Sequence, residues 1–82
     1  GMSFEMEKYM KRVNPEFSYE AGRVLEVNTG HPVFEALRTA MTEEPEKAKK
    51  YARVLLNQAK LIAGLPIDDP SGYTDLLCSL WN

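Results

Sequence analysis

Few side chains in this 82-residue chain have the type and spacing that chemistry needs. His31, the single histidine, could be a general base or a metal ligand, but beside a proline at an expected helix start it fits a capping or loop residue better. Cys78, the single cysteine, has no base partner in the sequence and fits a small core or interface residue. Asp68 and Asp69 could form a carboxylate pair, yet Asp69-Pro70 is typical of a helix start, so we expect capping. The sequence therefore indicates no catalytic residue and no metal site.

A basic run lies where a long helix is expected. It follows glutamates directly, and the mixture fits the solvated face of a helix better than a nucleic-acid contact. The run is Lys47, Lys49, Lys50 and Arg53, after Glu43, Glu44 and Glu46. The formal net charge of -2 also argues against nucleic acid or an anionic membrane as partner. Without a Gly-rich phosphate loop, zinc spacing or nucleophile motif, the sequence favours a non-enzymatic role with no cofactor of its own.

The first expected helix covers residues 3–13, with Ser3 as its N-cap and Asn14-Pro15 at its end. Apolar side chains fall on one face of it, and acids precede bases on the other, as the helix dipole favours. The apolar face consists of Met2, Met6, Tyr9, Met10 and Val13. Two interpretations stay open: the face packs in a core, or, because methionine is flexible and polarizable, it is an exposed surface that accepts varied partners.

The segment from Arg23 to Asn28 is the best strand candidate, because it is short, β-branched and bounded by turn signals. A strand needs a sheet partner for its backbone groups, and only residues 17–19 offer one. A helix that begins at Pro32 should follow. We therefore expect a mainly α (α+β) chain in the order helix, short strand and three helices.

Two amphipathic helices are expected from Pro45 to the chain end, with Gly64 closing the first and Asp69-Pro70 opening the second. Their apolar stripes are Ala48, Tyr51, Ala52, Leu55, Ala59 and Ile62, and Tyr73, Leu76, Leu77, Leu80 and Trp81. An apolar stripe must be buried, and no later residue of this sequence can cover the second one. This points to a partner, most simply a second copy related by a two-fold axis.

Composition fits one small domain that associates. Apolar residues make up 44% of the chain and charged residues 27%, and no apolar run is as long as a membrane span. A domain of this size often relies on disulfides, metal or association, and one cysteine with one histidine leaves association. We expect residues 1–82 to be one domain of a longer protein, with Gly1 left by tag removal and a reducing, cytoplasmic location.

Motifs along nearly the whole chain match one known family in the correct order. Val24-Leu25-Glu26-Val27-Asn28 and then His31-Pro32 resemble the family stretch Leu-Glu-Ile/Leu-Asn-Pro-Asp-His-Pro. Leu55-Leu56-Asn57-Gln58-Ala59, then Gly64, Asp69-Pro70 and Tyr73, are similar to Leu-Leu-x-Asp-Gln-Ala, Gly and Asp-Pro-x-x-Phe. Met2-Ser3 and Met6-Glu7-Lys8 resemble a Met-Ser-x-x-Met segment. By these motifs the chain resembles the C-terminal domain of the heat-shock protein 90 chaperones, of the bacterial high-temperature protein G type.

The resemblance implies a homodimerisation domain in which the final two helices of each protomer form an intermolecular four-helix bundle. The dimer-interface positions that it implies are Leu55, Ala59, Ile62, Tyr73, Leu76, Leu77, Leu80 and Trp81. The family's segment that binds unfolded or partly folded client proteins corresponds to Met2, Met6, Tyr9 and Met10. ATP and Mg belong to a separate N-terminal domain in this family, so the resemblance implies an ATPase parent and a non-catalytic piece.

The sequence departs from the family pattern at several positions. Asp75, Leu76 and Cys78 stand where basic residues and Asn are usual, and Thr29-Gly30 replaces Pro-Asp. The chain also lacks the acidic tail of cytosolic eukaryotic members, which favours a bacterial-type protein. Two other classes stay open: a stand-alone helical adaptor that binds a target helix in a groove, and, behind it, a helical nucleic-acid-binding domain.

Overall fold

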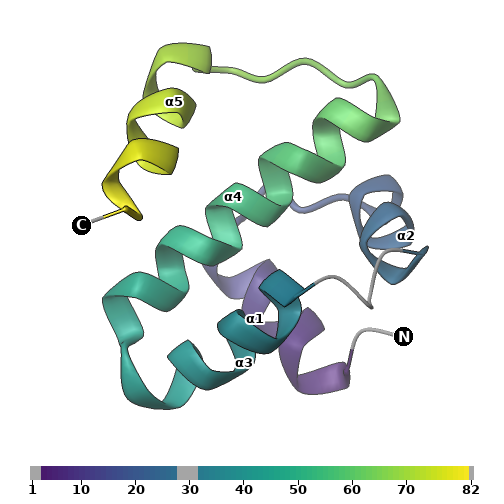
Figure 1. Cartoon of the computed structure of the whole chain (residues 1–82). Coiled ribbons are helices and arrows are strands. Elements are labelled where there is room, and N and C mark those ends of the chain that lie inside the picture. Colours follow the sequence, from purple (N-terminus) through teal and green to yellow (C-terminus); the bar gives the residue numbers. More distant parts are fainter. Residues whose placement is uncertain (1–2, 28–31, 82) are drawn as a thin grey trace.

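The longest helix, α4 (Pro45–Ala63), is the element on which the rest of the fold is assembled (Figure 1). The computed structural model describes residues 3–27 and 32–81. Around α4 it places α1 (Phe4–Val13), α2 (Tyr19–Val27), α3 (Pro32–Glu43) and α5 (Pro70–Ser79). All four pack against α4, with α5 lying apart from the group formed by the first three helices. The prediction of a mainly α chain is confirmed.

A stripe of buried apolar residues on α4 forms the centre of the core. Ala48, Ala52, Leu55 and Ala59 recur at steps of four, three and four, and each is at most 4% exposed. Such a stripe lies along one side of a helix. The same core contains Leu25 of α2, Met6 and Met10 of α1, and a set of α3 side chains; the α3 set is Phe34, Leu37 and Ala40. The apolar stripe of α4 is therefore covered largely within the chain.

The predicted strand from Arg23 to Asn28 is wrong, because residues 23–27 belong to helix α2; Asn28 lies outside the described residues. Ser18 caps this helix, since its Oγ accepts a hydrogen bond from the backbone N–H of Ala21 at 3.1 Å. Ala21 and Leu25, four residues apart, then face α4 together. A helix satisfies its backbone groups internally, whereas a strand here would have needed a sheet partner. The Ser18 cap and the burial of Ala21 and Leu25 therefore favour a helix here, despite the β-branched residues in the segment.

The predicted helix boundaries are confirmed at five positions. Ser3 accepts a hydrogen bond from the N–H of Met6 at 3.2 Å, and α1 ends before Asn14. Pro45 opens α4, and Gly64 ends it with a left-handed φ of 75°, a conformation that glycine adopts without a steric cost. Asp69 caps α5 by accepting a hydrogen bond from Gly72 at 3.0 Å. Local chemistry thus fixes where these helices begin and end.

Asn14 fastens the end of α1 to the central helix. It is 5% exposed, and its side-chain amide donates a hydrogen bond to the carbonyl of Ala52 at 3.2 Å. Among the described residues, no buried side-chain nitrogen or oxygen lacks a hydrogen-bond partner. α1 is therefore held against α4 both by buried apolar side chains and by this hydrogen bond.

Candidate protein-binding surfaces

Helix α5 is apolar yet buries none of its residues. Leu76, Leu77 and Leu80 are only partly covered, and Trp81, just beyond the helix, is 87% exposed. The helix does contact α4, so it is attached to the fold without being enclosed by it. An incompletely covered apolar face of this kind is typical of an interaction surface.

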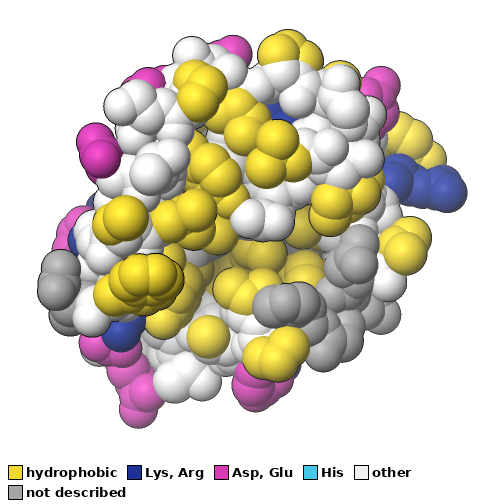
Figure 2. Space-filling view, turned by 45° about the horizontal axis from the view of Figure 1, so that its top comes forward, with side chains coloured by type: hydrophobic (Ala, Val, Ile, Leu, Met, Phe, Trp, Pro, Cys, Tyr) yellow, Lys and Arg dark blue, Asp and Glu magenta, His cyan; other side chains and the backbone are white. Residues whose placement is uncertain are grey.

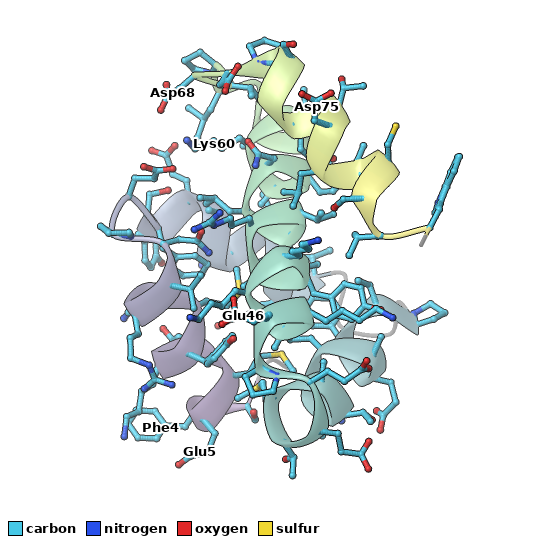
Figure 3. The ribbon with its side chains drawn as sticks, turned by 90° about the vertical axis from the view of Figure 1, so that its left-hand side faces the viewer. Phe4, Glu5, Glu46, Lys60, Asp68 and Asp75 are labelled. Atoms are coloured by element: carbon cyan, nitrogen blue, oxygen red, sulfur yellow. The ribbon has the colours of Figure 1, made fainter. Side chains whose placement is uncertain are left out.

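Polar contacts hold α5 and the loop before it in place. The Gln58 amide of α4 donates a hydrogen bond to the Tyr73 hydroxyl of α5. Lys60, whose side chain is only 13% exposed, pairs with Glu16 at 3.5 Å and with Asp68 at 4.0 Å (Figure 3). Lys60 therefore links α4 to the turn after α1 and to the loop before α5. These polar contacts add to the partial burial of the α5 leucines in holding the helix against α4.

A large polar cleft of about 680 Å³ lies between α5, α4 and the end of α1. Charged side chains of both signs line it, namely Glu16, Lys50, Arg53, Lys60, Asp68, Asp69 and Asp75. Tyr73 and Leu76 of the predicted dimer interface also face this cleft. Since its charges largely balance, the cleft does not select an ionic ligand of either sign.

A smaller, apolar groove of about 280 Å³ lies on the side of α4 that faces α2 and α3. Its lining is Val24, Leu25, Val33, Phe34, Val54, Leu55, Gln58, Ala59 and Ile62, with no charged residue. Figure 2 shows apolar side chains gathered around a hollow on this side of the molecule, with acidic and basic side chains toward the margin. The groove has room for one large side chain but is smaller than usual small-molecule pockets.

The structure divides the predicted dimer-interface residues between several surroundings. Leu55 and Ala59 are buried within the chain, at 4% and 0% exposure, and line the floor of the apolar groove. Ile62, at 63% exposure, stands at the groove on α4. Leu76, Leu77 and Leu80 are partly buried, and Trp81 is exposed. Their role in a dimer remains a prediction.

The predicted client-binding face of α1 is not exposed. Met6 is 2% exposed and Met10 is 0% exposed, and Tyr9 packs against the same core cluster. Met2 lies outside the described residues. Of the two interpretations that the sequence left open, core packing is the one found here. The expected exposure failed because α4 offers α1 an apolar face, which an isolated helix pattern cannot reveal.

Burial also affects the one ionisable side chain on this face. Partial burial raises the pKa of the Tyr9 hydroxyl, and the nearby Glu46 carboxylate acts in the same direction. Arg12, whose guanidinium lies 5.3 Å from the Tyr9 ring centroid, opposes the shift. Tyr9 therefore stays neutral at physiological pH and supplies no anion for catalysis.

The residues first considered for chemistry do not converge. Cys78 is exposed on α5, Asp69 caps that helix, and Asp68 pairs with Lys60; His31 lies outside the described residues. Within residues 3–27 and 32–81, no group of three or more His, Cys, Asp or Glu side chains could hold a metal ion. None of the helices in these ranges is long and apolar enough to cross a membrane.

Sequence reasoning missed the apolar groove. Val24 and Val33 were expected in a strand and at a helix start, and only the helical form of α2 brings both to one side of α4. A helical reading of residues 19–27, based on Ser18 as N-cap and on the spacing of Ala21 and Leu25, could have found it. The Lys60–Glu16 ion pair joins residues far apart in sequence, and no local signal predicts it.

The described residues form a small all-helical domain with an incompletely covered helix, α5, and an apolar groove on α4. Comparison with known proteins identifies its family: the model of the Hsp90 protein family matches residues 1–82. The chain therefore belongs to the heat-shock protein 90 family, as its motifs predicted. No solved structure gives a significant match.

Bacterial chaperones are among its relatives. The chaperone protein HtpG of Clostridium acetobutylicum is 40% identical over 79 residues, which cover 96% of this chain and 13% of that protein. HtpG of Oceanobacillus iheyensis has the same identity and coverage, and HtpG of Alkaliphilus metalliredigens is 43% identical over the same share. The chain thus spans 13% of the length of these relatives.

Proposed function

We propose that this chain is the C-terminal homodimerisation module of an ATP-dependent heat-shock protein 90 chaperone. In this proposal residues 1–82 form a single domain, and α4 and α5 pair with the same helices of a second copy in a four-helix bundle. Membership of the family supports a chaperone role. The observation that carries the dimer is that α5 has a run of large apolar side chains and buries none of its residues.

Sedimentation equilibrium tests the dimer directly. The unmodified chain should sediment as a dimer without ligand, and Leu77→Asp/Leu80→Asp should give a monomer, because each change places a charge in a desolvated contact. Phe4→Asp is the matched control: Phe4 is 71% exposed on α1, outside the proposed bundle, so this variant should remain dimeric. Circular dichroism confirms that all three chains stay helical.

A monomeric unmodified chain, or a double variant that still sediments as a dimer, contradicts the bundle. The first of these results favours the stand-alone adaptor. In that class, a groove on a monomeric helical domain receives a helix of a target protein.

Contact with unfolded clients is the second part of the proposed role. Met6 and Met10 can contribute only if α1 moves away from α4, because both are buried in the described fold. A client that binds through this face should therefore increase hydrogen exchange in α1. Client binding with unchanged protection of α1 rules out Met6 and Met10 as contacts.

We further propose that this piece carries no catalysis and binds no nucleotide, and that ATP and Mg act in another domain of a cytoplasmic parent protein. The support is the absence of a phosphate-binding loop from the sequence. Isothermal titration of the purified chain with Mg-ATP should give no saturable heat. Stoichiometric binding overturns this part of the proposal while leaving the dimer untouched.

A further inference from the structure

We infer that the apolar groove between α2, α3 and α4 is the seat for Trp81 of the partner subunit. This inference rests on the proposed homodimer and extends its interface from α4 and α5 onto α2 and α3. Two observations on the same molecule prompt it: a groove of about 280 Å³ with no charged lining, and a large side chain, Trp81, left 87% exposed.

The groove and the end of α5 match in polarity. The segment from Leu76 to Trp81 contains no Asp, Glu, Lys, Arg or His. A groove without charged residues accepts such a segment at no cost for desolvating an ion. Charged occupants, including the basic and acidic segments elsewhere on this chain, are disfavoured by the same argument.

One polar side chain in the groove can accept a hydrogen bond from the indole N–H of Trp81. Gln58 is the sole lining residue with a polar side chain, and its amide nitrogen donates to Tyr73. Its carbonyl oxygen remains as an acceptor. A buried Trp side chain needs one acceptor for its ring N–H, so Gln58 can orient the ring while the valines contact its faces.

Symmetry makes the contact reciprocal. α5 and the hollowed apolar surface both contribute to the side of the molecule seen in Figure 2. When one face carries both a protruding group and its receptor, a two-fold axis buries both on each copy at once. Trp81 is exposed and so does not occupy the groove of its own chain. A second copy is therefore the occupant that we assign.

The intrinsic fluorescence of the chain reads this contact directly, because Trp81 is its single tryptophan. On dilution through the dimer dissociation range, emission should shift from that of a buried indole to that of an exposed one, in step with the mass from sedimentation. A dimer whose emission stays that of an exposed indole overturns the groove contact but leaves the proposed function standing. Buried-type emission that is independent of concentration also overturns it, since the ring then lies in its own chain.

Substitutions on α2 separate the groove from the bundle, because α2 is not one of the paired helices. Val24→Lys at the groove should weaken dimerisation at least about tenfold and expose Trp81, while Val27→Lys, at an 83% exposed site of the same helix, should do neither. Trp81→Ala should weaken the dimer by about 30-fold, as loss of an interface hot spot does. Trp81→Phe should fall between, because it keeps the ring and loses the N–H. Equal dimerisation of Val24→Lys and Val27→Lys, with circular dichroism unchanged, contradicts the inference.

Discussion

Helices α1 and α5 make an instructive pair, since both have ten residues, an apolar stripe and a side-chain N-cap. α1 buries Met6 and Met10 against the core, whereas α5 buries nothing. The sequence leaves the α1 face open between core packing and exposure and predicts an uncovered α5 face; in the described residues α1 is buried and α5 is only partly covered. The spacing of apolar residues identifies a face, but it does not identify what covers that face.

The difference lies in how each helix joins α4. α1 is followed by Asn14, whose buried amide reaches the carbonyl of Ala52 and holds the helix end against the core. α5 is held by the hydrogen bond between Gln58 and Tyr73 and by ion pairs of Lys60 with its preceding loop. Pairs that involve exposed carboxylates contribute little stability. α1 therefore belongs to the folding core, and α5 is an attached surface element.

The largest expected effect follows from the burial of the methionines. Met10→Ala should lower the free energy of unfolding by about 2–5 kcal/mol, because a fully buried side chain leaves a cavity. Met6→Ser/Met10→Ser should come close to unfolding a domain of this size. Urea denaturation followed by circular dichroism measures both.

Phe4→Ala is the control for this comparison, since Phe4 lies on the same helix and is 71% exposed. Its effect should stay below about 0.5 kcal/mol. If Met10→Ala were equally mild, α1 would not be part of the core, and the contrast with α5 would disappear.

A middle-sized effect is expected at Asn14. Asn14→Ala removes a buried hydrogen bond and should cost about 1–2 kcal/mol in the free energy of unfolding. Asn57→Ala offers a matched control, because the Asn57 amide also donates to a backbone carbonyl, that of Arg53, but in an exposed position. A loss at Asn57 as large as that at Asn14 would show that burial does not decide the effect.

Most helix boundaries were predictable because their causes are local. Ser3, Gly64 and Asp69 act on backbone groups within a few residues of themselves, so a single sequence suffices to place them. The exception is residues 23–27, where β-branched composition and a bounding turn pointed to a strand. Burial of Ala21 and Leu25 against α4 decided that segment, and this contact is tertiary.

The candidate surfaces were only half predictable. The apolar stripe of α5 could be recognised, because its spacing is regular and its burial is not achieved within the described chain. The groove could not, because it needs α2, α3 and α4 together, and its residues are spread from Val24 to Ile62. The apolar face of a single helix can be predicted from the spacing of its residues. A groove between several helices can be located only once the tertiary structure is known.

The caps of the two helices should respond differently to the same kind of change. Ser3→Ala should lower global stability by about 1 kcal/mol, because α1 unfolds with the core. Asp69→Ala loses a similar local contact, but since α5 buries no residue, global stability measured on the monomer should change by less than about 0.5 kcal/mol. Hydrogen exchange should instead show fraying confined to α5. A global loss at Asp69 equal to that at Ser3 would mean that α5 folds cooperatively with the rest.

The smallest expected effect is on the alkaline side of the stability curve. Burial and Glu46 raise the pKa of Tyr9 above its ordinary value of 10.0, so the folded state holds this proton more tightly than the unfolded state does. The contribution is fully present below pH 10 and is lost as pH rises through the folded pKa. The free energy of unfolding, measured by urea titration below and above pH 10, should therefore fall less in Tyr9→Phe than in the unmodified chain. Tyr19→Phe, at a 78% exposed side chain, is the matched control for the loss of a tyrosine hydroxyl. Identical alkaline declines in all three chains would show that the Tyr9 hydroxyl is exposed to solvent. The face of α1 that the methionine substitutions test would then be exposed as well.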